Sequence, residues 1–337
     1  MNGRIELQRE YFTKLPTVIY ESPDFKATMF RYNSGVEGLE IKNSRGRIVV
    51  LPYMGQMIWD LEFDGVDMKM KGMYNEPKKC SCIIDTYGCF AYHAGLVRNG
   101  CPSPEDDHVL HGEMPCADMD KAWLEITPDS VKITGSVEYV KGFGHHYLAH
   151  PSATIFAGKT HIEIGMDVKN LASVSMPLQY MCHTNYAYFA NATLTQNIPD
   201  SGIVLRQTIP AHVKPTPKWL EFNKELLESK VPIKVLNRPE MYDPEIVFFA
   251  DRIDQYQKRA HFEMAAPDGT TLFAEFDTAD LKYATRWILY NGDQQVGAFV
   301  LPATCRPEGF LAAQKAGTLI MLRPNEQKSF RVISGKK

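Results

Sequence analysis

Several features of membrane, secreted and nucleic-acid-binding proteins are missing from this sequence of 337 residues. No stretch reaches the roughly 18 consecutive apolar residues that a membrane-spanning helix needs. The N-terminal segment MNGRIELQREYFTKLP is charged and lacks the apolar stretch of a signal peptide. With 37 Lys and Arg against 40 Asp and Glu, the net charge is −3, which argues against a basic nucleic-acid-binding surface. We therefore expect a soluble cytoplasmic protein that binds a small molecule and neither nucleic acid nor a membrane.

The sequence also lacks the cysteine pairs that mark zinc and thioredoxin-type sites. Its seven cysteines, an odd number, stand at positions 80, 82, 89, 101, 116, 182 and 305, and no two are spaced as Cys-x-x-Cys. We expect free thiols in a reducing compartment, and we predict neither a resident metal nor another cofactor.

Helical patterning, internal repeats and flexible linkers are scarce. The best candidate helix covers residues 217–229, where apolar residues recur at helical spacing. No fixed-period repeat, low-complexity tract or Gly/Ser linker supports a domain boundary, although the chain is about twice the usual length of one domain. The sequence therefore predicts one large domain over residues 1–337.

Short strand-like segments are abundant. They are bounded by Gly, Pro, Asn and Asp, and cover residues 27–32, 38–42, 47–51, 57–63, 130–140, 161–169, 178–183, 245–249, 260–265, 271–276, 296–301 and 328–333. Turn residues that tolerate positive φ separate several of them, as at 43–46, 64–65 and 267–269. This pattern predicts an all-β fold, a large antiparallel β-sandwich.

Polar residues that could take part in catalysis or binding gather in three regions. The first, 87–123, is a turn-rich segment with His93, Arg98, Asn99, His111 and Glu113, and long segments of this kind in compact domains are usually functional or disordered. Its aromatic content argues against disorder. A surface loop with capped turns is an equally good interpretation of any one of these residues taken alone.

The other two regions lie later in the chain. Residues 176–189, MPLQYMCHTNYAYF, place His183 among aromatic side chains that could form the platform of a sugar site, with an imidazole for proton transfer. Residues 283–309 contain Arg286, Trp287 and Glu308. Trp287 could stack on a ligand or fill the core, and core filling is the commoner fate.

These segments resemble the galactose mutarotase-like (aldose 1-epimerase) superfamily, and within it a mutarotase-related branch. The resemblance covers about residues 38–330 and rests on GQMIWDLEFDG (55–65), GLVRNG (95–100), VLHGEMPCADMDKAW (109–123) and DVKNLASVSMPLQYMCHTNYAYF (167–189). It implies a large antiparallel β-supersandwich with a carbohydrate cleft on the concave face of one sheet.

The resemblance also implies a mechanism and candidate residues. A carboxylate takes the proton of the anomeric hydroxyl, a histidine protonates the ring oxygen, and the ring opens, rotates and closes. His183 matches the family's general acid, and His111 matches the histidine that holds substrate oxygens. Arg98 and Asn99 lie where the family keeps an Asn-Arg pair, in reversed order. Further substrate contacts expected here are His93, Glu113, Asp243, Arg286 and Trp287, of which Asp243 looks like the aspartate that grips sugar hydroxyls.

One position departs from the family. Its catalytic glutamate lies on a late strand, and the equivalent stretch AFVLPATCRPEG places Leu301 or Pro302 there. A leucine cannot accept a proton from a hydroxyl. Glu308 is the candidate substitute base, although a turn glutamate is at least as good an interpretation of it.

Three functions remain open at this point. The first is aldose 1-epimerase-like interconversion of sugar anomers, with His183, His111 and Glu308 as catalytic residues. The second is a sugar-binding or regulatory protein that kept the cleft and lost the base. The third is a metal-assisted sugar isomerase or lyase whose ligands would be His93, His111, Glu113 and His183. An uncovered strand edge could also support a homodimer.

Overall fold

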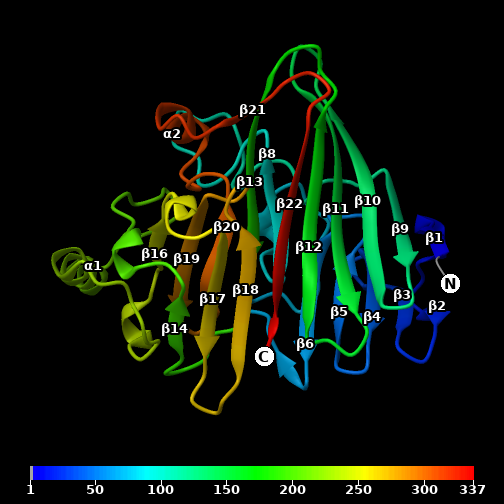
Figure 1. Cartoon of the computed structure of the whole chain (residues 1–337), viewed down its shortest axis with the longest axis horizontal. Helices are drawn as coiled ribbons and strands as arrows, with labels where there is room; N and C mark the ends of the chain where they lie inside the picture. The colour runs from blue at the N-terminus through cyan, green and yellow to red at the C-terminus, as the bar shows by residue number, and fades with distance from the viewer. Residues whose placement is uncertain (1–2) are drawn as a thin grey trace.

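The computed structural model describes residues 3–337, and almost all of its regular structure is antiparallel strand (Figure 1). The strands form two sheets, of nine and thirteen strands. In spatial order the nine-stranded sheet contains β1 (Gly3–Leu7), β9 (Lys121–Ile126), β10 (Ser130–Val140), β11 (His146–Phe156), β12 (His161–Asn170), β22 (Gln327–Lys336), β18 (Thr271–Asp277), β17 (Arg259–Ala265) and β14 (Thr193–Gln196).

The thirteen-stranded sheet contains the central strands of the fold. Its main path is β15 (Ile203–Leu205), β16 (Ile246–Ala250), β19 (Tyr283–Tyr290), β20 (Gln295–Ala303), β13 (Met176–Thr184), β8 (Ala91–Leu96), β6 (Met57–Phe63), β5 (Gly46–Leu51), β4 (Glu37–Lys42), β3 (Lys26–Arg31) and β2 (Thr17–Glu21). Two short strands lie off this path, since β7 (Val66–Asp67) pairs with β6 and β21 (Ile320–Leu322) pairs with β13.

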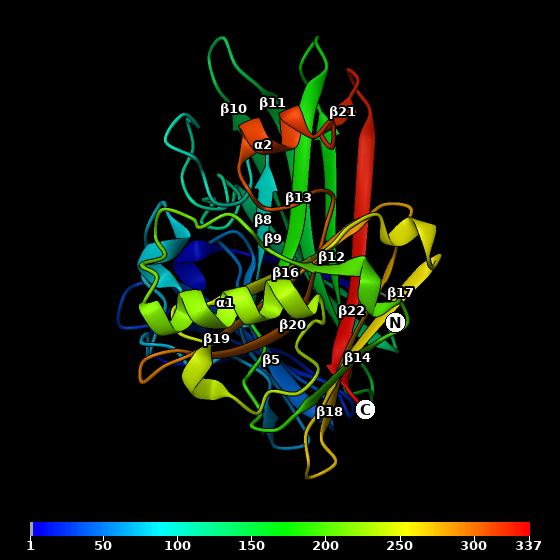
Figure 2. The ribbon, with the colours of Figure 1, turned by 90° about the vertical axis from the view of Figure 1, so that its left-hand side faces the viewer.

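Helices are few and lie at one side of the molecule. The two α-helices among residues 3–337 are α1 (Pro217–Ser229) and α2 (Phe310–Lys315), and Figure 2 shows α1 crossing in front of β16, β19 and β20. The predicted helix 217–229 is confirmed: Thr216 caps its N-terminus by accepting the backbone N–H of Trp219, and Lys230 ends it in the left-handed conformation. Short 3₁₀ turns cover Arg9–Tyr11, Ile83–Thr86, Asp200–Gly202, Pro239–Met241 and Ile253–Gln255. Among residues 3–337, no helix is long and apolar enough to cross a membrane.

Two apolar clusters follow from the way the sheets are covered. Strands of the nine-stranded sheet such as β17 and β18 bury alternate residues, because one face packs inward and the other meets solvent. The larger cluster fills the space between the sheets and includes Tyr180 and Cys182 of β13. The second cluster lies on the opposite face of the thirteen-stranded sheet and includes Tyr92, Met181 and Leu301. Strand β13 is therefore buried along its whole length.

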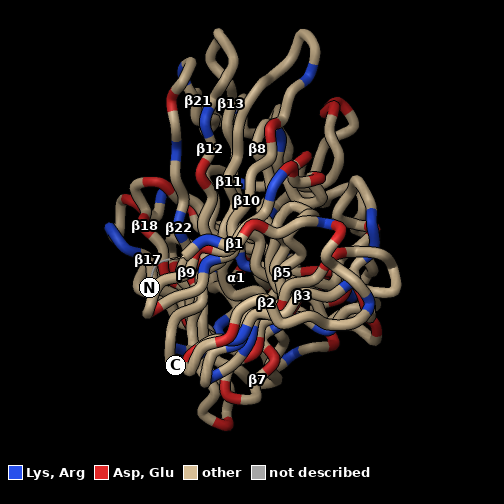
Figure 3. Tube along the Cα trace, turned by 90° about the vertical axis from the view of Figure 1, so that its right-hand side faces the viewer, with Lys and Arg blue, Asp and Glu red and all other residues tan. Residues whose placement is uncertain are grey.

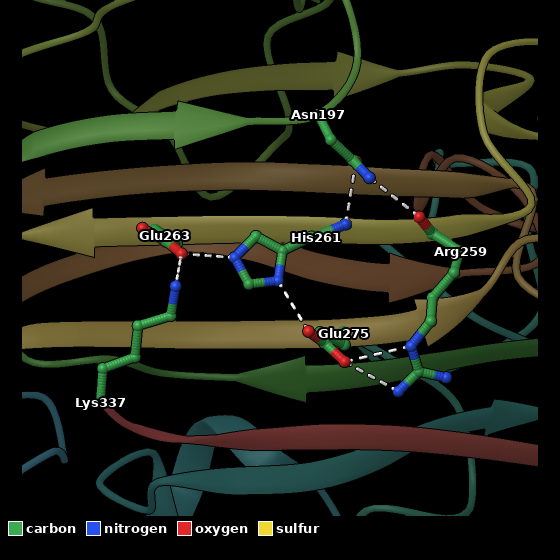
Figure 4. Close-up of polar contacts among 6 residues, drawn as sticks. All are labelled: Asn197, Arg259, His261, Glu263, Glu275 and Lys337. Atoms are coloured by element: carbon green, nitrogen blue, oxygen red, sulfur yellow. Dashed lines mark hydrogen bonds and ion pairs between the residues drawn. The ribbon is translucent and has the colours of Figure 1, made fainter.

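The outer face of the nine-stranded sheet carries charge. Figure 3, which views the sheets from their edge, shows Lys and Arg interspersed with Asp and Glu along the trace. On β17 and β18 the ring of His261 lies between Glu263 and Glu275, with its Nδ1 at 2.9 Å from Glu275 Oε1 (Figure 4). Arg259 and Lys337 pair with the same two carboxylates. Partly exposed pairs of this kind add little stability, but they keep this face solvated.

All twelve predicted strand segments lie on strands of the structure, so the all-β prediction is confirmed. Sequence patterning missed other strands, and β8 shows why. Its sequence AYHAGL is rich in Ala and Gly, and all six residues are buried. A strand covered on both faces has no polar and apolar alternation to reveal it.

Burial of His93 predicts that the protein loses stability as the pH falls below neutrality. Its side chain lies between the sheets, where Nδ1 is 2.9 Å from the hydroxyl of Tyr180, and burial lowers its pKa from 6.5 to about 3. The unfolded chain therefore binds a proton first. This contribution to the free energy of unfolding is fully present above pH 6.5 and is lost as the pH falls toward 3, by at most about 1.4 kcal/mol per pH unit.

Urea denaturation between about pH 7.5 and pH 5.5 measures this slope. We expect His93→Gln to flatten it, and we expect His146→Gln, which changes a partly exposed histidine paired with Glu138, to leave it close to that of the wild type. Equal slopes for His93→Gln and the wild type would contradict the attribution of this pH dependence to buried His93.

Candidate functional site

A cleft of about 290 Å³ opens on the face of the thirteen-stranded sheet that points away from the other sheet. Its floor comes from β13, β16, β19 and β20, and its walls come from the loops around them. The lining side chains include Tyr87, His111, His183, Arg206, Asp243, Glu245, Thr285, Trp287 and Leu301. A cleft of this size with convergent polar groups suits a small polar ligand.

His183 lies in the cleft because of the pleat of β13. Its neighbours in the strand, Cys182 and Thr184, point to the opposite face, where Cys182 joins the core between the sheets. The imidazole stacks on the ring of Tyr92 with centroids 4.5 Å apart. Burial, and then the charge of nearby His111, hold the pKa of His183 well below its ordinary value. The imidazole is therefore neutral at neutral pH.

Two tyrosines fix the orientation of this imidazole. The hydroxyl of Tyr87 is 3.2 Å from Nε2 of His183, and the hydroxyl of Tyr92 donates to that of Tyr87 at 3.3 Å. Because Tyr87 accepts from Tyr92, its own proton is free to face Nε2. Burial raises the pKa of both phenols well above 10, so both remain protonated hydrogen-bond donors.

His111 reaches the cleft from an unusual turn. It has a φ of 61°, and the following Gly112 has a φ of 81°. A Cβ on Gly112 would lie 1.9 Å from the carbonyl oxygen of Arg98, so only glycine fits there. The turn brings the ring of His111 within 4.8 Å of the ring of His183, centroid to centroid. Burial lowers the pKa of His111 to about 3, with smaller effects from His212, His108 and Arg206.

The cleft also holds two carboxylates on the bend just before β16. Glu245 Oε2 accepts the indole N–H of Trp287 at 2.8 Å, and its Oε1 lies 3.9 Å from Nε2 of His212. Asp243 Oδ1 accepts the side-chain amide of Asn291 at 3.1 Å. The ring of Trp287 in turn lies 5.9 Å from that of His183, so Glu245 and His183 both lie next to the same indole.

Comparison with known proteins identifies the fold. No protein-family model and no curated protein matches the sequence. Among solved structures, the chain is similar to a protein of Klebsiella pneumoniae whose name assigns it provisionally to the aldose 1-epimerases, at 15% identity and a TM-score of 0.83 over 100% of this chain and 91% of that one. The chain has the galactose mutarotase-like fold.

Two further solved structures are similar to this chain. A protein of Synechocystis matches at 14% identity and a TM-score of 0.64, over 89% of this chain and 95% of that one. A galactose mutarotase-like protein of Clostridium acetobutylicum matches at 15% identity and a TM-score of 0.62, over 94% and 99% of the two chains. The galactose mutarotase-like fold predicted from the sequence is confirmed, and at this identity the likeness extends to the fold alone.

Within the galactose mutarotase-like fold, four residues predicted for the site line the cleft. They are His111, His183, Asp243 and Trp287. Leu301 also lines it. Glu308 does not: its Oε1 accepts the hydroxyl of Thr208 at 2.6 Å, and the carboxylate lies 3.8 Å from Arg206 and 3.7 Å from Arg306. Its carboxylate therefore contacts Thr208, Arg206 and Arg306 beside the cleft.

Two of the expected substrate contacts have structural partners deep in the protein. His93 bonds to Tyr180 in the core between the sheets. Arg286 lies on the same side of the sheet, where its guanidinium donates to the carbonyl oxygens of Phe299 and Ile233 and to Gln196 Oε1. Burial lowers the pKa of Arg286 to about 10. Neither side chain lines the cleft.

The other three lie in or near the loop that carries His111. Glu113 Oε1 accepts the backbone N–H groups of Leu96 and Val97 and the hydroxyl of Tyr147, which fixes the chain just after β8. Arg98 pairs with Asp107. Asn99 is buried, and its amide has no partner among the described residues. These residues shape the loop rather than the cleft surface.

The four ligands of the metal-assisted alternative do not converge. His93 and Glu113 bond to Tyr180 and Tyr147, which belong to the core between the sheets, whereas His111 and His183 face the cleft. Across residues 3–337, no group of three or more His, Cys, Asp or Glu side chains is arranged to hold a metal ion.

Sequence reasoning missed Glu245 although a signal was present. Glu245 stands two positions after the predicted Asp243, on the same bend and directly before a strand, so its proximity to Asp243 was the signal.

The Leu-His-Gly turn supports a direct test. We expect Gly112→Ala to destabilise the protein by about 3 kcal/mol or more, because alanine is strained at this φ and its methyl group meets a carbonyl oxygen. Gly142→Ala is the matched control, since its Cβ would meet nothing within 4 Å, and should stay within about 0.5 kcal/mol of the wild type. Urea denaturation of both variants measures the difference, and a Gly112→Ala protein as stable as the control would contradict the turn.

Proposed function

We propose that the protein interconverts the anomers of a free aldose in this cleft, with Glu245 as the base and His183 as the acid. The observation that carries the proposal is that Glu245 and His183 line one cleft and both lie next to Trp287. A general acid and a general base placed around one small ligand are what opening of a hemiacetal ring requires.

The proposed reaction follows from these positions. Glu245 accepts the proton of the anomeric hydroxyl, the bond between C1 and the ring oxygen breaks, and protonated His183 gives its proton to the ring oxygen. Rotation about the C1–C2 bond presents the other face of the aldehyde. On ring closure, Glu245 gives its proton to the carbonyl oxygen, and the hydroxyl formed from the ring oxygen returns its proton to His183. Trp287 holds Glu245 by its indole N–H, and Tyr87 holds the imidazole.

The remaining polar atoms of the cleft support a ligand rich in hydroxyl groups. Nδ1 of His111 and Oγ1 of Thr285 are buried and have no hydrogen-bond partner among the described residues. Such atoms are satisfied by a ligand or by water. Arg206 adds a guanidinium whose donors fit paired oxygens, and Trp287 offers an apolar surface to a sugar ring.

Anomeric exchange by saturation-transfer NMR on a panel of hexoses and pentoses tests the proposal. We expect Glu245→Gln and His183→Gln each to lower the exchange rate by at least about 100-fold, because each removes one partner of the proton transfer. Glu228→Gln, which changes an exposed residue of α1, should keep the wild-type rate. Glu308→Gln tests the other candidate base. Wild-type exchange in Glu245→Gln, or none in the wild-type protein, would overturn the proposal.

The low pKa of His183 predicts an unusual pH profile. The protonated acid is a minor species at neutral pH, so kcat/KM should rise about tenfold per unit as the pH falls toward that pKa. Exchange rates measured between about pH 8 and pH 6 check this slope. A kcat/KM that falls over this range would show that the neutral imidazole is the active form.

The second candidate function is a sugar-binding protein without catalysis. Leu301 favours it, because this apolar residue lines the cleft near the position of the family's catalytic glutamate. Sugar binding without catalysis predicts line broadening or shifts of sugar resonances on binding, with no exchange between anomers. The same NMR samples distinguish the two functions.

A further inference from the structure

Two thiols meet between the loops that wall the cleft. Cys80 lies in the loop between β7 and the 3₁₀ turn Ile83–Thr86, and Cys116 lies in the loop between β8 and β9. Their Sγ atoms are 3.7 Å apart, and both side chains are partly exposed. By contrast, Cys89, Cys182 and Cys305 are buried.

We propose that Cys80 and Cys116 are a redox modification site, which forms an intramolecular disulfide with peroxide as the oxidant. A disulfide needs an S–S distance of about 2 Å, so each sulfur has to move by roughly 1 Å from its place in the thiol pair. Both residues stand in loops outside the strands, where side-chain rotation and small backbone shifts are cheap. The pair therefore needs no rearrangement of either sheet.

The reaction balances with one peroxide for each disulfide. The thiolate of Cys80 attacks one peroxide oxygen, the O–O bond breaks, and the departing hydroxide takes a proton to leave as water. Cys116 then attacks the sulfur of the resulting sulfenic acid, the S–O bond breaks, and a second water leaves. Two thiols lose two electrons and two hydrogens, and a dithiol reductant reverses the change.

Burial sets the conditions under which this reaction runs. It raises the pKa of both thiols, and the neighbouring Cys80 raises that of Cys116 further. Both sulfurs are therefore thiols at neutral pH, and the rate of oxidation should increase with pH as the thiolate forms.

The crosslink would join two segments that supply the cleft with side chains. Tyr87 follows Cys80 in one loop, and His111 precedes Cys116 in the other. Both contact His183, the first through its hydroxyl and the second ring to ring. The disulfide would tie these two walls together, whichever reaction or ligand the cleft serves.

The test uses the full chain, reduced, freed of reductant and treated with a small excess of hydrogen peroxide. We expect the thiol count of the denatured protein to fall from seven to five and the mass to fall by two hydrogens. Trypsin leaves Cys80, Cys82 and Cys89 in one peptide and Cys101 and Cys116 in another, so fragment spectra of the linked peptides identify the pair. The oxidised protein should melt about 5 °C higher than the reduced protein.

Three serine variants decide the assignment. Cys80→Ser and Cys116→Ser should each lose the crosslink and the rise in Tm, while Cys82→Ser, which changes a partly exposed cysteine two residues from Cys80, should keep both. Circular dichroism checks that each variant is folded. Seven thiols after oxidation, a link that maps to Cys82 or joins two chains, or a gain of oxygen instead of a loss of hydrogen would each overturn the proposal.

Discussion

Strand β13 is covered on both of its faces, and much of the structure depends on how its side chains alternate. Tyr180 and Cys182 point into the core between the sheets, while Met181 and His183 point toward the cleft. A shift of one residue in the pairing of β13 with β8 would exchange these sets, burying Met181 in the core and removing His183 from the cleft. The pairing that stabilises the sandwich is thus also what places the imidazole.

Burial gives the cleft its electrostatic character. His183 and His111 stand beside aromatic rings and away from water, which favours their neutral forms. The carboxylates of Asp243 and Glu245 lie on the wall before β16, each held by a nitrogen donor of a side chain. Neutral imidazoles and held carboxylates in one small cleft are an arrangement suited to moving protons on a polar ligand.

The loops around the cleft carry most of the remaining chemistry. The loop between β8 and β9 presents His111 through a turn that only glycine can complete, and Glu113 anchors the same loop to the end of β8. This loop also carries Cys116, which meets Cys80 of a second wall. The thiol pair therefore lies in the same loops that wall the cleft, while neither sulfur belongs to the cleft floor.

The sequence by itself determined the all-β class, the galactose mutarotase-like fold and the helix 217–229, and it singled out His111, His183, Asp243 and Trp287, which line the cleft. Period-two patterning and ordered motifs are local, so they can be read along the chain. Whether a polar residue faces the cleft or the core depends on strand pairing and on the pleat, which one chain segment does not reveal. His93 and Arg286 are residue types that are common in binding sites. Strand pairing nevertheless turns the side chain of His93 on β8 and that of Arg286 on β19 toward the core. Only the tertiary structure brought Glu245 next to Trp287, and Cys80 next to Cys116, because these contacts join segments far apart in the sequence.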